Sequence, residues 1–202
     1  MARERDEAKR LAILSGAKRL FAERGFHGVS VSDLAREIDL PVGSIYTYFE
    51  SKESIVATVV EEGWAVFVAS LEAALSGPGG PDERLSLVLY RFLPRLFADV
   101  DFISIVLAEA GKSFGLKEKL ERLSALVSGL VTELAAERGL LMDFPPERTK
   151  TAIVVCFLGS IEAVHLGMCA GIDIGPEDVI DYIRLSIERG FGVEIIKPVQ
   201  LE

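Results

Sequence analysis

Residues 25–35 of the chain are GFHGVSVSDLA, and residues 42–53 are VGSIYTYFESKE. In the first stretch Ser30 directly precedes an apolar run with helical spacing, and Asp33 follows three residues later. This order predicts a capped helix over residues 31–38. The second stretch predicts a short helix over Pro41–Phe49. Residues 36–43 would then form a turn between the two helices, and the pair predicts a helix-turn-helix unit.

Helices are also predicted on both sides of this unit. Residues 6–24 carry a periodic apolar face that ends at Gly25. Ser51 is expected to cap a long helix that begins near Lys52 and stops before the linker GPGGP at residues 77–81. Five further helices are predicted near Pro81–Val100, Phe102–Phe114, Leu116–Arg138, Pro145–Ala170 and Pro176–Arg189.

The expected fold class is all-α, because no segment shows the alternating pattern of a strand. We expect an N-terminal three-helix helix-turn-helix domain that binds DNA at residues 1–51. A C-terminal helical domain is expected at residues 52–202. Pro94 interrupts a helical pattern and is expected to kink or split that helix.

The charge of the chain leaves nucleic-acid binding undecided. The formal net charge is −9, but residues 1–52 carry nine Lys and Arg against eight Asp and Glu. The N-terminal quarter is therefore the part least repelled by phosphate, although it is not a basic patch.

The second short helix would lie in the major groove of DNA. Its exposed positions are expected to be Val42, Ser44, Thr47 and Tyr48, whose hydroxyl groups can bond phosphates or bases. Ile45 and Phe49 are expected to pack inward. Gly43 would let a backbone or phosphate approach closely, and Lys52 opens a helix whose free N–H groups favour an anion. Phosphate binding can thus be built from neutral donors and one lysine.

These two stretches closely resemble the N-terminal domain of the TetR family of transcriptional regulators, over about residues 8–60. The resemblance rests on the Gly-aromatic pair at Gly25, the capped second helix and the Tyr-x-Tyr-Phe-x-x-Lys-Glu ending at residues 46–53. It implies that Ser30 caps its helix and touches phosphate. It also implies DNA contacts by Gly43, Ser44, Tyr46, Thr47, Tyr48 and Lys52. The segment Leu40–Val42 departs from the polar or basic residues that members often carry, and Val42 could contact a thymine methyl.

The resemblance further implies a homodimer that binds double-stranded DNA through its N-terminal domain. The C-terminal domain, residues 52–202, would bind a small effector and dimerise. The effector would shift the long helix after Lys52 and change the separation of the two DNA-binding heads, whose half-sites lie about 34–36 Å apart. Residues 149–170 and 176–189 are expected to form the dimer interface. The first is apolar all round, with small residues at Gly159, Ala163 and Gly167, and the second is amphipathic.

The effector pocket is expected to have an apolar wall and a few polar anchors. The wall candidates are Trp64, Phe67, Tyr90, Phe92, Phe102, Phe114 and Phe157, and the polar candidates are Arg91, Glu109 and Glu162. An apolar ligand, acyl or aromatic, fits this composition. For any single aromatic residue, ordinary core packing is the more common explanation.

Other classes of protein fit the sequence less well. Thr151–Ile172 is long enough to span a membrane, but a central Glu162 is unfavourable in lipid, so a buried helix is favoured and no membrane association is expected. Glu162, His165 and Cys169 have metal-ligand spacing, but a di-iron bundle needs a second Glu-x-x-His. We expect no metal, no cofactor and no enzymatic activity.

The two cysteines and the N-terminus bear on the compartment. Cys156 and Cys169 lie in apolar sequence without a CxxC spacing, which predicts reduced core residues of a cytosolic protein. The charged N-terminus has no apolar segment typical of a signal peptide.

Overall fold

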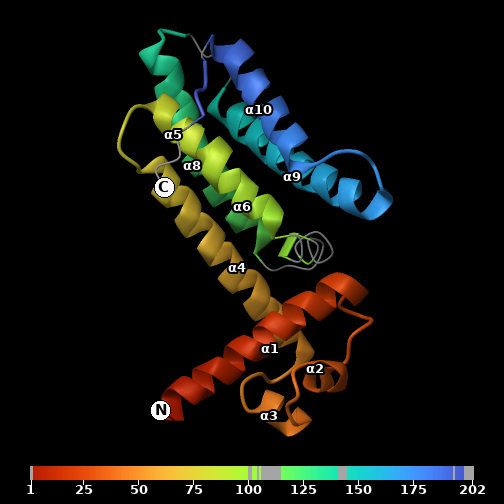
Figure 1. The fold of residues 1–202 in the computed structure, drawn as a ribbon. Helices are drawn as coiled ribbons and strands as arrows, with labels where there is room; N and C mark the ends of the chain where they lie inside the picture. The colour runs from red at the N-terminus through yellow and green to blue at the C-terminus, as the bar shows by residue number, and fades with distance from the viewer. Residues whose placement is uncertain are drawn as a thin grey trace. The chain divides into compact units, whose positions relative to one another are not determined.

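The computed structural model describes residues 2–99, 102, 103, 105, 115–140, 145–192 and 194–197. Every regular element within these ranges is helical, which confirms the predicted all-α fold class. The chain divides into two compact units (Figure 1). Unit 1 comprises Met1–Val66 and Asp99–Phe114, and unit 2 comprises Phe67–Ala98 and Gly115–Glu202.

Unit 1 contains α1 (Ala2–Arg24), α2 (Val31–Glu37), α3 (Val42–Tyr46) and the first part of α4 (Lys52–Leu75). The helix α2 packs against both α1 and α3. Apolar side chains from all four helices form one core, whose most deeply buried members include Ile13, Leu20, Leu34, Ile45 and Ile55. The observed helices lie within a few residues of the predicted ones, because their caps and apolar spacing are local signals.

A short segment after α6 also belongs to unit 1. Lys18 Nζ on α1 donates to the Asp99 carboxylate at 2.5 Å, and Asp99 Oδ1 accepts from the backbone N–H of Phe102 at 3.1 Å. The Phe102 ring lies against Gly63 of α4, where a Cβ would collide with it. The chain thus returns from unit 2 into the core of unit 1, a connection that no local pattern predicts.

Unit 2 is built from the end of α4 and the helices α5 (Pro81–Leu87), α6 (Leu93–Ala98), α8 (Leu116–Glu137), α9 (Pro146–Ala170) and α10 (Pro176–Phe191). Helix α8 packs against α5 and α9, and α10 packs against α6 and α9 (Figure 1). Gly171 and Gly192 end α9 and α10 in the left-handed conformation, at φ values of 66° and 63°.

The predicted break at Pro94 takes the form of a π-helical turn, η1 (Val88–Phe92), between α5 and α6. Proline has no N–H to donate, and its ring clashes with the carbonyl four residues earlier in a regular α-helix. A wider turn just before Pro94 removes this clash, so the helix continues through α6 without a separate loop.

The described end of the chain folds back on unit 2. Ile195 is buried, its N–H donates to Glu188 Oε1 at 3.0 Å, and the Ser86 hydroxyl donates to the Ile196 carbonyl at 2.6 Å. Arg184 holds the other side of the Glu188 carboxylate at 2.8 Å. Residues 194–197 therefore cover the apolar cluster formed by α5, η1 and α8.

Candidate functional site

The turn before α2 is stabilised by a reciprocal cap. The backbone N–H of Asp33 donates to Ser30 Oγ at 3.1 Å, and the Asp33 carboxylate accepts from the Ser30 N–H at 3.0 Å. The Ser30 hydroxyl also donates to this carboxylate, which is the main reason that the pKa of Asp33 lies below its usual value. The stabilisation from the bonds to the ionised carboxylate is therefore present at neutral pH and is lost as the pH falls through the lowered pKa, whereas the bond from the Asp33 N–H to Ser30 Oγ does not depend on this ionisation. The predicted cap at Ser30 is confirmed, and its phosphate contact stays a prediction.

The turn between α2 and α3 lies within residues 36–43, where the sequence predicts it. The Leu40 N–H donates to the Ala35 carbonyl at 2.9 Å, and Asp39 adopts the left-handed conformation at φ 53°. A non-glycine residue rarely takes this conformation, although a short polar side chain such as Asp tolerates it. Pro41 then precedes α3, and its carbonyl accepts from the Ser44 N–H at 2.8 Å.

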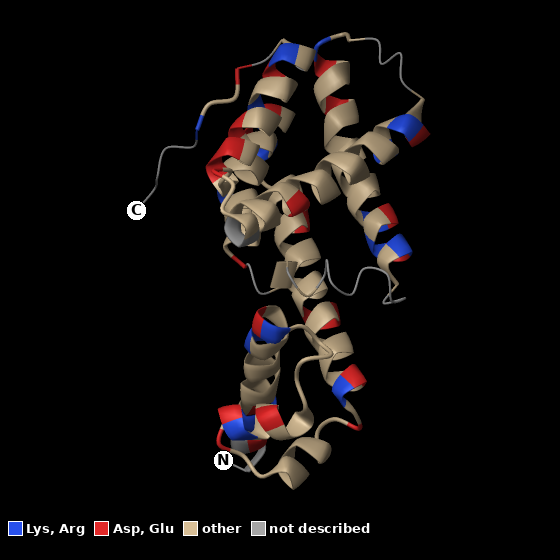
Figure 2. Ribbon diagram, turned by 90° about the vertical axis from the view of Figure 1, so that its right-hand side faces the viewer, with Lys and Arg blue, Asp and Glu red and all other residues tan. Residues whose placement is uncertain are grey.

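Helix α3 presents an uncharged surface. Ile45 and Phe49 are buried, as predicted, whereas Tyr46 is 53% and Val42 37% exposed. A Cβ at Gly43 would meet no atom of the chain within 4 Å, so nothing inside the fold requires glycine there. Figure 2 shows no charged residue on α3. Neutral donors and apolar contacts are thus what this surface offers to a partner.

Two further side chains of this surface already have partners within unit 1. The Thr47 hydroxyl donates to the Ser44 carbonyl at 2.6 Å, and the Tyr48 hydroxyl donates to Asp6 Oδ1 on α1 at 2.5 Å. The bond to Asp6 raises the pKa of Tyr48, so its hydroxyl stays protonated at neutral pH. A phosphate that accepts from Tyr48 would have to displace a carboxylate.

We therefore expect Asp6→Asn to tighten DNA binding by about fivefold at low salt. The change removes one negative charge beside the expected phosphate, and a pair of unit charges at 4 Å in water is worth about 1 kcal/mol. Fluorescence anisotropy of a labelled duplex measures the effect. Glu118→Gln on α8 in unit 2 makes the same change in net charge and should leave affinity unchanged. Unchanged or weaker binding by Asp6→Asn would contradict a DNA contact by Tyr48.

Lys52 has a different environment from the one expected for a free phosphate ligand. Its Nζ donates to the carbonyls of Phe26 and Val29, both at 2.7 Å, and lies 4.1 Å from the centroid of the Phe26 ring. Two of its three protons thus tie the turn before Ser30 to the start of α4. The sequence shows that a lysine begins this helix but contains no signal for these tertiary bonds.

Unit 2 contains a cavity of about 720 Å³, partly open to solvent, between α4, α5, η1, α6, α8, α9 and α10. This volume lies in the range of small-molecule sites. Its wall is made mostly of Leu, Val, Ile and Phe side chains, and none of the described lining residues is Lys, Arg, His, Asp or Glu. The Phe67 ring packs at a tilt against the rings of Phe92 and Phe157, with centroid separations of 5.0 and 5.6 Å.

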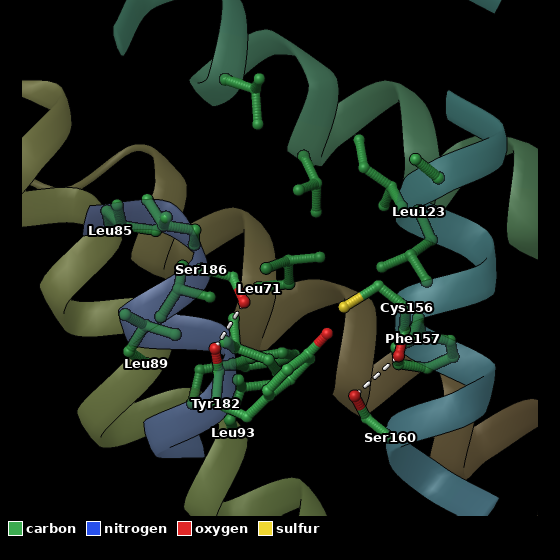
Figure 3. A pocket seen from close by; sticks show the side chains of 18 of the residues that line it. Leu71, Leu85, Leu89, Leu93, Leu123, Cys156, Phe157, Ser160, Tyr182 and Ser186 are labelled. Atoms are coloured by element: carbon green, nitrogen blue, oxygen red, sulfur yellow. Dashed lines mark hydrogen bonds between the residues drawn. The ribbon is translucent and has the colours of Figure 1, made fainter. Parts of the chain in front are cut away.

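A few polar groups also line the cavity. Figure 3 shows the side chains of Cys156 on α9 and Tyr182 on α10 at its centre. The Ser160 and Ser186 hydroxyls, in contrast, donate to the carbonyls of Cys156 and Tyr182, at 2.6 and 2.8 Å. Cys156 was expected in the core, but it is exposed, and this part of the prediction is wrong. Its apolar neighbours in the sequence line a cavity rather than a packed interior.

The predicted pocket residues divide into three groups. Phe67, Phe92 and Phe157 line the cavity. Trp64 and Phe102 belong to unit 1, Tyr90 packs with the cluster covered by residues 194–197, and Arg91 and Glu162 are exposed. Glu109 and Phe114 lie outside the described residues. The leucines and valines of the wall were missed because in the sequence they have the same pattern as core residues.

Helix α9 carries apolar side chains that its own chain leaves uncovered. Val155 is 66% and Leu166 42% exposed, and on α10 Leu185 is 44% exposed. Lys52–Leu75 and Pro146–Gly167 are both long and apolar enough to cross a membrane, with 44% and 11% of their apolar windows buried. Helix α4 is thus partly buried in the core, whereas most of the apolar surface of α9 is left for another surface to cover.

Other details of α9 limit what it can do. A Cβ at Gly167 would collide with the Ile174 carbonyl, so this glycine serves the turn after α9 within the chain. Among the side chains that the structure describes, no three His, Cys, Asp or Glu lie close enough to hold a metal ion. The side chain of Cys169 lies outside the described residues.

Comparison with known proteins bears on both units. The family model described as bacterial regulatory proteins, tetR family, matches residues 13–59. The fatty acid metabolism regulator protein of Bacillus subtilis is 26% identical over 130 residues, which cover 62% of this chain and 67% of that protein. The transcriptional repressor NemR of Escherichia coli is 34% identical over 74 residues, 36% of this chain and 37% of NemR. The chain thus matches little more than a third of the length of NemR.

Solved structures of similar fold match nearly the whole chain. FadR from Bacillus subtilis, in complex with stearoyl-CoA, has a TM-score of 0.70 at 19% identity and covers 88% of this chain and 96% of its own. PfmR from Thermus thermophilus has a TM-score of 0.68 at 21% identity and covers 89% of this chain and 93% of its own.

These relatives are regulators of transcription and not enzymes. The capped helix-turn-helix of unit 1 and the matching family model lead to the same conclusion. Together the family model, the relatives and the structures of similar fold indicate a TetR-family transcriptional regulator.

Proposed function

We propose that this regulator is a repressor that binds an inverted-repeat operator as a homodimer and leaves it when an apolar effector enters unit 2. The observation that carries the proposal is the cavity of about 720 Å³, which lies in the same chain as a DNA-binding unit and has an uncharged described wall. A ligand-free role in transcription would not need an apolar cavity of this size, because protein interiors are normally close-packed.

The DNA contacts are proposed for the exposed face of α3 and its neighbours. Val42, Gly43, Tyr46 and Thr47 are exposed on this face, with Ser44 half-buried beside them. Ser30 and Tyr48 would bond phosphates after exchanging their carboxylate partners, Asp33 and Asp6. Lys52 would contribute mainly by holding the turn at Phe26–Ser30, with one proton left for phosphate.

The homodimer is proposed to form through α9 and α10. If two copies of α9 meet about a two-fold axis, the apolar face of each helix would cover Val155 of the other chain. The charge-poor helix fits such an interface better than a membrane, because Glu162 is exposed near its centre. Since a repressor acts on the chromosome, we place the protein in the cytoplasm.

The effector is proposed to carry a long acyl chain. The curated relative from Bacillus subtilis regulates fatty acid metabolism by its name, and the FadR structure holds stearoyl-CoA. An alkyl chain suits a wall of Leu, Val, Ile and Phe, whereas a carboxylate or phosphate would find no cation among the described lining residues. The charged end of such a molecule would remain outside the cavity.

The test begins with selection of bound duplexes from a random pool by the full-length protein. We expect an inverted repeat, bound with an affinity that falls steeply with salt. Addition of stearoyl-CoA should release the duplex, while coenzyme A alone should not. Failure to select any specific duplex would overturn the proposed DNA-binding role. A tighter complex with stearoyl-CoA would indicate that the effector acts as a co-repressor instead.

A helical protein-interaction or membrane-associated module is the alternative function. It would be favoured by sedimentation of the protein with lipid vesicles together with an absence of specific duplex binding.

A further inference from the structure

A second, smaller cavity of about 70 Å³ adjoins the main one in unit 2. Five side chains line both cavities, namely Leu85, Val88, Val127, Val131 and Ile187. They come from α5, η1, α8 and α10 and form the partition between the two spaces. Three residues line the smaller cavity alone: Leu75 at the end of α4, and Leu130 and Leu134 on α8.

The smaller cavity has only aliphatic side chains in its described wall. A site without polar partners does not hold an ordered water, so an alkyl group could enter it without displacing one. Leu130 and Leu134 are 5% and 2% exposed, and behind them Ile195 completes the same apolar cluster. The α8 side of the small cavity is thus formed by buried side chains.

The side chains of the partition limit which ligand groups can pass from the main cavity into the small one. Its five side chains are single aliphatic groups that can change rotamer without breaking a hydrogen bond. An extended, unbranched alkyl chain needs the least displacement of these groups, whereas an aromatic ring or a branched end needs more. The small volume beyond them accepts only the last carbon atoms of a chain.

We propose that the small cavity is the tail subsite of the effector site and that Leu75, Leu130 and Leu134 set the length of the chain that binds. The inference rests on the proposed acyl effector and adds where its chain ends: the chain lies in the main cavity and its tail ends against α8. Each methylene that enters is worth about 0.8 kcal/mol, or roughly a fourfold gain in affinity. The gain stops when the chain meets Leu130 and Leu134.

The experiment is a binding series with saturated chains from decanoyl to eicosanoyl, as free fatty acids in one arm and as coenzyme A thioesters in the other. Titration calorimetry on the full-length protein gives the dissociation constant at each length. We expect affinity to rise with length to an optimum and then fall. The arm that binds more tightly identifies the source of the chain, and the length of the optimum should be the same in both arms.

Two variants test the assigned residues. Leu134→Phe fills the small cavity and should move the optimum to shorter chains by about two carbons, with little change for the shortest ligands. Leu75→Phe should act in the same direction and is the safer variant for folding, because Leu75 is only half-buried. Leu123→Phe, which narrows the main cavity alone, should weaken all lengths by a similar factor. Far-ultraviolet circular dichroism checks that each variant is folded.

The outcomes separate the two proposals. An optimum that both small-cavity variants leave unmoved, with normal binding by the wild type, would overturn the tail subsite and leave the apolar effector standing. Wild-type protein that binds no chain of any length would overturn the acyl effector and the tail subsite with it, whereas selection of an operator would be unaffected.

Discussion

Replacing Val155 with arginine is expected to convert the regulator from a dimer to a monomer and to lower its affinity for an inverted-repeat operator by a hundredfold or more. Val155 is 66% exposed in the single chain and lies in the apolar part of α9. In a two-fold interface the change would bring two unpaired cations into an apolar surface, which costs several kcal/mol. Loss of the second DNA-binding head removes a gain of about 10²–10⁴ in affinity.

Sedimentation velocity measures the mass of the variant, and anisotropy with full and half operators measures binding. The monomer should bind a full operator no more tightly than a half operator. Ala136→Arg is the matched control, because it adds the same charge at an exposed position on α8. A Val155→Arg protein that remains dimeric would place the interface elsewhere and contradict the role of α9.

Replacing Lys52 with methionine is expected to lower the free energy of unfolding of unit 1 by about 2–3 kcal/mol. Methionine keeps much of the aliphatic stem but removes both hydrogen bonds to the Phe26 and Val29 carbonyls. Hydrogen bonds to a charged donor are worth more than neutral ones, and the Phe26 ring also loses its cation. DNA affinity should fall as well, since the turn before Ser30 is no longer held.

Thermal denaturation, together with amide exchange of residues 26–30, checks this expectation. Lys117→Met serves as the control, because the Lys117 side chain is 81% exposed and should cost little. The salt dependence of DNA binding separates the two roles of Lys52. A phosphate ligand without a structural role would leave the melting temperature unchanged and reduce the salt slope by about one.

Most helix boundaries could be predicted from the sequence because the signals that set them are local. The Ser30 and Asp33 side chains satisfy backbone groups three residues apart, and Gly25 ends α1 at a φ of 69°. The GPGGP linker separates α4 from α5 through another local signal, because its glycine and proline residues interrupt a helix. The inward packing of Ile45 and Phe49 followed from their spacing on one helical face.

The candidate sites could be predicted only in part. The resemblance to a known family predicted the proposed DNA-binding surface, whose residues adjoin one another in sequence. The effector site is different, because its wall comes from seven elements between Phe67 and Ile187. Aromatic residues were therefore a poor guide to it, and Trp64 and Phe102 lie in the other unit.

By itself the sequence determined the all-α fold class, the order of the helices and the helix-turn-helix, since caps, apolar spacing and turn residues act over three or four positions. Only the tertiary structure decided that Lys52 holds the turn at Phe26–Val29 and that Tyr48 is bonded to Asp6. It alone decided which leucines enclose a cavity rather than fill a core. The physical reason is that these features depend on side chains far apart in the chain, whose meeting is set by packing and not by local conformation.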